Sequence, residues 1–185
     1  MDMILDVRLN PREICTAQQK GACIVGGRIR FFTKRCVAAS NQRIKNAIVD
    51  AMRDLGIPLV VGVRAEGRKN VRTEKVRYTI PRSRPVRLDV VYFFPFPTST
   101  PSKRREEDAW MVERPDLDNL TKSVQDVLTE LCVWEDDAQV AAVHLEKHRT
   151  DEEPRIAVRV RTADDLSSPE HFAFRGIAQH DGSLI

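Results

Sequence analysis

Several features that define large protein classes are absent or scarce in this 185-residue chain. The four cysteines form no CxxC pair and no histidine lies at zinc-finger spacing, so we expect reduced structural thiols rather than a zinc or redox site. No apolar run approaches the roughly 18 residues of a membrane span, and the acidic N-terminus lacks the features of a secretory signal. Aromatic residues make up 6%, too few for an extensive base-stacking surface. We therefore expect a cytoplasmic, single-domain protein with no membrane partner.

Charge is distributed unevenly along the chain. Residues 20–87 hold 17 Lys and Arg against 4 Asp and Glu, whereas residues 88–140 hold 5 against 12. This suits a metal-dependent enzyme that acts on a polyanion, because cations hold phosphates and carboxylates hold a metal. The same pattern is also compatible with charged loops that are merely solvated. The basic residues that we expect to contact DNA are Arg28, Arg30, Lys34, Arg64, Arg68, Lys69, Arg72 and Lys75.

Hydrophobic periodicity predicts both helices and strands. Two apolar runs flank Gly26-Gly27, which tolerates the positive φ values of a tight hairpin turn. Apolar residues recur at the helical period in two segments and alternate with polar residues in three others. The elements predicted in chain order are a hairpin over residues 22–32, a helix over 37–55, short strands over 59–63 and 76–80, a strand over 86–94, a helix over 118–131, and strands around 143–147 and 156–160.

Groups suited to metal-assisted chemistry gather at the start of the second helix. Extended backbone through Asp116-Leu117-Asp118 sends both carboxylates to one side and Leu117 towards the core. Mg²⁺ prefers oxygen ligands and keeps several waters, so two or three carboxylates are a normal protein share of its shell. Lys122 lies one helical turn beyond Asp118, where an ammonium can stabilise charge on a phosphate. A pair of acids at a helix start is also a common cap, and Lys122 is equally placed to pair with Asp118 or Asp126.

A second acidic pair, Asp136-Asp137, follows the helix. A helix from Asp118 to Leu131 is about 20 Å long, and six extended residues after it also cover about 20 Å. Asp137, or Asp136, therefore completes the cluster within one chain only if the chain doubles straight back. The other possibility is that it completes a site across a subunit interface.

The segment from Pro115 to Lys122, followed by the segment from Trp134 to Val140, closely resembles the RusA family of Holliday-junction resolvases. The resemblance covers about residues 86–160 and, more weakly, 22–55. It implies that Asp116, Asp118 and Asp137 bind Mg²⁺, with Mn²⁺ as a substitute, and that Lys122 is the catalytic lysine. Asn119 and Asp136 match supporting positions of the motif.

The same resemblance implies a compact α+β domain with a mixed β-sheet flanked by helices. It also implies a homodimer whose two sites nick opposed strands of a four-way DNA junction, encoded by a bacterium or a phage. We place this domain at residues 1–162, with a C-terminal tail over 163–185. Segments near 64–85 and 96–113 look like additions to a smaller family core.

Three other functions remain open on the sequence. The chain is also compatible with a branched-DNA binding protein that no longer cuts, or with a nuclease for flaps and forks. A metal-dependent phosphatase or nucleotide hydrolase uses similar carboxylates, but it has no need of a long basic region.

Overall fold

The computed structural model describes residues 2–15, 20–26, 28–33, 35–57, 79–105 and 109–162. Its strands are β1 (Asp2–Val7), β2 (Lys20–Val25), β3 (Arg28–Thr33), β4 (Val86–Pro95), β5 (Val140–Thr150) and β6 (Arg155–Thr162). Its helices are α1 (Arg35–Asp54) and α2 (Leu117–Glu130), and its short 3₁₀ helices are η1 (Pro11–Glu13), η2 (Ser102–Arg104) and η3 (Asp137–Gln139). In the part of the chain so described, no helix is long and apolar enough to span a bilayer.

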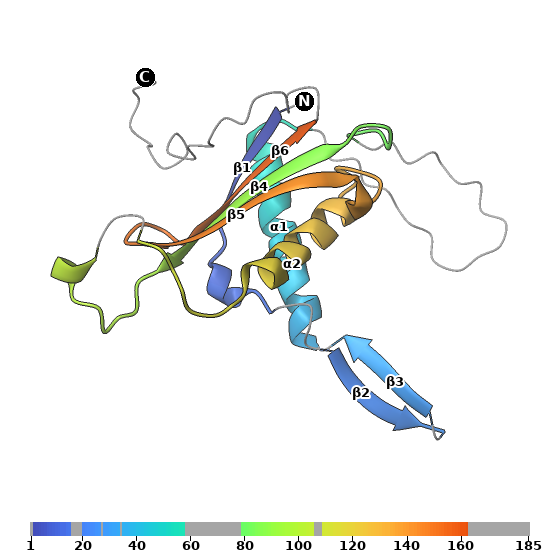
Figure 1. Ribbon diagram of the computed structural model, residues 1–185, viewed down its shortest axis with the longest axis horizontal. Coiled ribbons are helices and arrows are strands. Elements are labelled where there is room, and N and C mark those ends of the chain that lie inside the picture. Colours follow the sequence, from blue (N-terminus) through green and yellow to red (C-terminus); the bar gives the residue numbers. More distant parts are fainter. Residues whose placement is uncertain are drawn as a thin grey trace.

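A four-stranded mixed sheet in the order β1-β6-β4-β5 is the centre of the fold. Strand β4 pairs antiparallel with β6 and parallel with β5, whereas β1 pairs antiparallel with β6. Both helices cover one face of this sheet, with α1 against β1 and α2 against β5 (Figure 1). The predicted α+β architecture with a mixed sheet flanked by helices is confirmed.

The main core lies between the sheet and the two helices. Alternate residues of β4 point into it, from Val86 through Leu88, Val90 and Tyr92 to Phe94. The helical period buries Leu120, Val124, Val127 and Leu128 of α2 against the same core, as the apolar pattern predicts.

The predicted hairpin is present as β2 and β3, with Gly26 at φ 58°. It stands away from the sheet beyond the N-terminal end of α1 (Figure 1). Ile24 and Ile29 face each other across the two strands and are both exposed.

Helix α1 ends where the sequence predicts. Gly56 adopts φ 66° and its N–H donates to Arg53 O at 2.9 Å, while Ile57 N donates to Met52 O at 2.9 Å. These two bonds form the glycine-dependent end that satisfies the last helical carbonyls. The proposed tail, residues 163–185, lies outside the described residues, as do most of the segment near 64–85 and the strand predicted over 59–63. Of the strand predicted over 76–80, only Thr79 and Ile80 are described, and they lie in no strand. The division at residue 162 and the two insertions therefore remain predictions.

Candidate active site

The first acidic pair lies at the N-terminus of α2. Asp116 is the cap residue, with extended backbone angles (φ −74°, ψ 142°), and its carbonyl accepts from Leu120 N at 3.2 Å. Its carboxylate makes no capping bond and is approached by Asn119 Nδ2 at 3.5 Å. Asp116 and Asp118 are exposed, whereas Leu117 packs against the core. The two carboxylates therefore face solvent at the positive end of the helix dipole.

A buried hydrogen-bond chain holds this end of α2 against the sheet. The Thr121 hydroxyl donates to Leu117 O at 2.8 Å, and the Tyr92 hydroxyl of β4 lies 3.2 Å from Thr121 Oγ1. Tyr92 is fully buried, and this burial raises the pKa of its phenol, so the hydroxyl stays a neutral hydrogen-bonding group. The first turn of α2 is thus anchored to the middle of the sheet.

Lys122 follows one turn later, as the spacing predicts. Its ammonium lies 3.4 Å from Asp126 Oδ1, one turn further along the helix, and the side chain is 57% exposed. In this arrangement the Lys122 ammonium forms an ion pair with Asp126 and not with the first acidic pair. Exposed side chains exchange rotamers on the nanosecond scale, so the same ammonium can also reach towards Asp118.

The second acidic pair is built into a tight turn. Asp136 caps η3, and its Oδ1 accepts from Ala138 N at 2.9 Å, which lowers the pKa of this carboxyl. Gln139 completes the turn because its Oε1 accepts from Glu135 N at 2.9 Å and from Asp136 N at 3.2 Å. The Gln139 amide nitrogen donates to Pro81 O at 3.1 Å and to Arg84 O at 3.2 Å. Asp137 is the exposed first residue of η3.

The fold separates the two acidic pairs within one chain. Strand β5 starts at Val140, just after η3, and comes level with the start of α2 only at Lys147, whose ammonium contacts Pro115 O at 2.9 Å. The seven residue steps from Val140 to Lys147 span about 23 Å of strand, and the fourteen residues of α2 run about 21 Å in the opposite direction. These element lengths place Asp137 about 20 Å from Asp116. Among the described residues, no three His, Cys, Asp or Glu side chains are grouped to hold a metal.

The segment that leads into the first acidic pair runs along β5. Arg149 N donates to Ala109 O at 2.7 Å and Met111 N donates to Lys147 O at 3.0 Å, while the Trp110 and His148 rings lie 4.4 Å apart. Lys147 also donates from its side chain to this segment. The sequence analysis gave no functional role to Lys147 or to Gln139, although Gln139 lies in the segment that resembles the family. An Asp-x-x-Gln capping pattern signals Gln139, and a lysine on the strand face that carries Val143 and Leu145 is a weaker signal for Lys147.

Two of the eight residues predicted to contact DNA, Arg28 and Arg30, lie in the described part of the chain. Lys34, Arg64, Arg68, Lys69, Arg72 and Lys75 lie outside the described residues. Arg28 is exposed at the tip of the hairpin, and Arg30 lies in β3.

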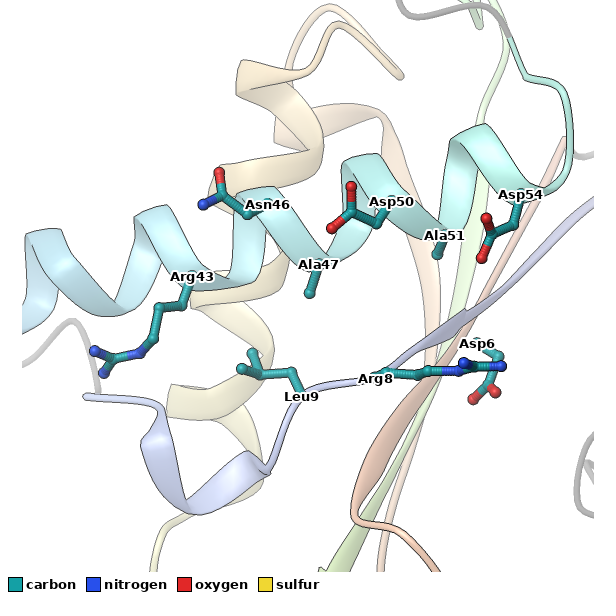
Figure 2. Close-up of a pocket in the computed structure, with 9 residues that line it drawn as sticks. All are labelled: Asp6, Arg8, Leu9, Arg43, Asn46, Ala47, Asp50, Ala51 and Asp54. Carbon is teal, nitrogen blue, oxygen red and sulfur yellow. The ribbon is translucent and has the colours of Figure 1, made fainter.

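A pocket of about 420 Å³ lies elsewhere, between α1 and the segment Asp6–Leu9 (Figure 2). Asp50 and Asp54 of α1 line it together with Asp6. Asp50 is paired with Arg53 at 3.1 Å. None of the predicted site residues lines this pocket, so it is not the site that the motif indicates.

A family profile and a phage relative name the same family. The profile of the family described as Endodeoxyribonuclease RusA matches residues 63–161. A crossover junction endodeoxyribonuclease rusA of Lactococcus phage r1t is 28% identical over 145 residues, which cover 78% of this chain and 87% of the phage protein. The uncharacterized protein YqaN of Bacillus subtilis (strain 168) is 37% identical over 83 residues, which cover 42% of this chain and 57% of that protein. Because the family match spans more than half of its length, this chain belongs to the RusA family of endodeoxyribonucleases, which are hydrolases.

Proposed function

We propose that this protein is a Mg²⁺-dependent endonuclease that resolves Holliday junctions by paired nicks during DNA recombination and repair. Family membership supports the reaction class, and the printed name of the phage relative supports a crossover junction as substrate. The observation that carries the proposal is the solvent-facing acid pair Asp116 and Asp118 at the N-terminus of α2. The proposed setting is the cytoplasm of a bacterium, with a gene of bacterial or phage origin.

The donor set of the first acidic pair fits a hard divalent cation. Asp116 and Asp118 offer only oxygen ligands, which suit Mg²⁺ or Mn²⁺, and neither carboxylate is used to cap the helix. When bound, such a cation supplies Lewis acidity at the scissile phosphate and a more acidic water.

The remaining motif residues have roles that follow from their positions. Asn119 Nδ2 is placed 3.5 Å from Asp116 Oδ2 and helps to orient that carboxylate. Lys122, once it leaves Asp126, carries a positive charge one turn from Asp118 and stabilises negative charge that develops on the phosphate. Asp136 holds the turn that presents Asp137.

The third carboxylate is proposed to come from a second copy of the chain. Asp137 lies about 20 Å from the first acidic pair of its own chain, which is too far to share one ion. In a two-fold dimer, Asp137 of the partner subunit completes each site, and two equivalent sites result. Two sites related by a two-fold axis suit opposed strands of a four-way junction.

The basic residues are proposed to hold the DNA backbone. Arg28 projects from the hairpin tip, and the run Arg64 to Lys75 adds further cations. Phosphate contacts by lysine and arginine depend strongly on salt, because binding releases condensed counterions. We therefore expect junction affinity to fall steeply as salt rises.

Cleavage of defined DNAs tests the proposal. We expect the protein to cut a synthetic four-way junction in Mg²⁺ but not in EDTA, with symmetric nicks, and to leave linear duplex intact. Preferred cutting of flaps or forks would change the substrate. Binding without cutting in both Mg²⁺ and Mn²⁺ would instead indicate a branched-DNA binding protein.

Mixed subunits test the origin of the third carboxylate. Asp118→Asn and Asp137→Asn chains are each expected to be inactive alone. If the partner subunit supplies Asp137, a heterodimer of the two variants has one intact site and recovers single nicks. If each site forms within one chain, both chains of the heterodimer stay defective and the mixture remains inactive.

A further inference from the structure

The segment Ala109–Pro115, which we name the strap, delivers the first acidic pair to the N-terminus of α2. Its first half pairs with the edge of β5 through main-chain bonds of Arg149 and Lys147. Its second half leaves the strand and turns into the helix, with a cis peptide between Arg114 and Pro115. Beyond Met111, the contacts that tie the strap to β5 come from side chains.

Two basic side chains of β5 hold this second half. Lys147 Nζ donates to Glu113 O at 2.7 Å and to Pro115 O at 2.9 Å. Arg149 donates to Glu113 Oε2 at 2.8 Å and to Pro95 O at 3.0 Å. Arg149 is the more deeply set partner, with a side chain 9% exposed against 60% for Glu113.

The hydrogen bond from Lys147 to the Pro115 carbonyl lies directly beside Asp116, a proposed metal ligand. The Pro115 carbonyl belongs to the same planar peptide unit as the Asp116 N–H. The Lys147 ammonium therefore fixes the orientation of the peptide plane that precedes the Asp116 Cα. The cap conformation of Asp116 leaves its carboxylate unused by the helix, so its direction depends on this backbone. Lys147 lies beside Tyr92 of β4, and Tyr92 in turn hydrogen-bonds Thr121 in the first turn of α2.

Packing alone does not require a lysine at position 147. Val143 and Leu145 precede Lys147 on the same face of β5, and a methionine would fill similar space without the cost of removing a charge from water. Only a group with several donors can join the carbonyls of Glu113 and Pro115.

We propose that Lys147 is a positioning residue that sets the direction of the metal-binding carboxylates Asp116 and Asp118 by clamping the strap. This inference rests on the proposed function of the acid pair. Residues that orient metal ligands from outside the coordination shell typically contribute 10- to 100-fold to metal affinity or activity.

The test compares Lys147→Met with the wild type in metal binding and in DNA binding. Calorimetric titration of the full-length protein with Mn²⁺ is expected to show affinity weakened about 10-fold or more. The Mg²⁺ concentration for half-maximal junction cleavage should rise by a similar factor. Junction affinity in EDTA should stay within about twofold, because the lysine binds carbonyls rather than phosphate. Lys103→Met, on the exposed η2 helix, is the matched control and should change none of these values.

Conservative variants separate positioning from folding. Lys147→Arg retains the positive charge and several donors and should recover much of the Mn²⁺ affinity, whereas Lys147→Gln keeps only two donors on a neutral, shorter side chain and should recover less. If Lys147→Met does not fold, the Arg and Gln variants carry the same comparison.

Two results would overturn the inference. Unchanged Mn²⁺ affinity in the Met and Gln variants excludes a role in setting the carboxylates. If junction affinity in EDTA falls by as large a factor as Mn²⁺ affinity, Lys147 is a phosphate contact instead. A wild type that binds Mn²⁺ but cuts no branched DNA refutes the proposed function, and the Mn²⁺ titrations still test the clamp.

Discussion

The acid pair at the N-terminus of α2 and the carboxylates on the sheet face opposite the helices differ in how their charge is balanced. On that sheet face Asp89 is fully buried, with Arg87 Nε at 2.9 Å and Arg161 Nη2 at 3.4 Å. Asp2 accepts from Arg159 at the sheet edge. Asp116 and Asp118 are exposed, and no lysine or arginine of the described residues lies within ion-pairing distance of either.

This difference separates carboxylates that hold the fold from carboxylates that are available to a ligand. A buried carboxylate needs its cationic partners, because removing one partner leaves a costly charge behind. Two solvent-facing carboxylates without cationic partners gain from a bound cation instead. Charge density alone does not distinguish these cases, since both regions are rich in charged residues.

The largest expected effect comes from Asp118→Asn. We expect cleavage of a four-way junction to fall by about 1000-fold or more, because a ligand oxygen with full charge is lost from the proposed metal site. The free energy of unfolding should change by less than about 1 kcal/mol, since the carboxylate contributes only its interaction with the helix dipole. Single-turnover cleavage and urea denaturation measure the two quantities.

A matched control is Asp151→Asn, which removes an exposed carboxylate that pairs with Arg105. It should leave cleavage unchanged. If Asp118→Asn destabilised the fold as strongly as it lowered cleavage, the contrast between the two regions would disappear.

The next effect concerns stability and comes from Asp89→Ala. This change removes the carboxylate that accepts from both Arg87 and Arg161 inside the sheet face, and we expect a loss of about 3 kcal/mol in the free energy of unfolding. Asp89→Asn should lose less, because its amide oxygen still accepts one hydrogen bond. Denaturant titration at pH 7 measures both, and a loss below about 1 kcal/mol for the alanine variant would show that the ion pairs contribute little.

The smallest effect is a pH dependence at Asp2. Hydrogen bonds from Arg159 lower the pKa of Asp2 below its ordinary value, so its stabilising contribution is present above about pH 4 and is lost as pH falls through the folded-state pKa. Because the side chain is 41% exposed, Asp2→Asn should cost at most about 1 kcal/mol at pH 7. The difference between variant and wild type should shrink towards pH 3. A difference that is the same at pH 3 and pH 7 would contradict an ionic origin.

Local patterns predicted the main elements of the fold. The 3.6-residue period located α2 to within one residue at each end, and Gly26 and Gly56 marked a turn and a helix end because both need positive φ. The polar–apolar alternation over residues 86–90 predicted β4 and placed Asp89 on the opposite face from Leu88. The burial of that opposite face was not predictable, because Arg161 comes from a strand 72 residues away.

The candidate site was predictable only in its local part. Asp116, Asp118 and Lys122 lie within seven residues, so one helix start decides their placement. Lys147 meets the strap across 32 residues of sequence, and Gln139 meets Pro81 across 58. Such contacts follow from which strands pair, and no short-range period encodes that pairing.

The sequence by itself determined the two helices, the hairpin, the strands β4, β5 and β6, the acidic motif at the start of α2 and the family of the chain, because each depends on neighbouring residues. Only the tertiary structure decided that α2 and β5 run in opposite directions beside each other. That arrangement carries Asp137 about 20 Å from Asp116, since β5 needs seven residues to return to the level of the helix start. The register that pairs Val140 with Val86 starts β5 directly after η3, so Asp137 stays beyond the C-terminal end of α2 while Asp116 caps its N-terminal end.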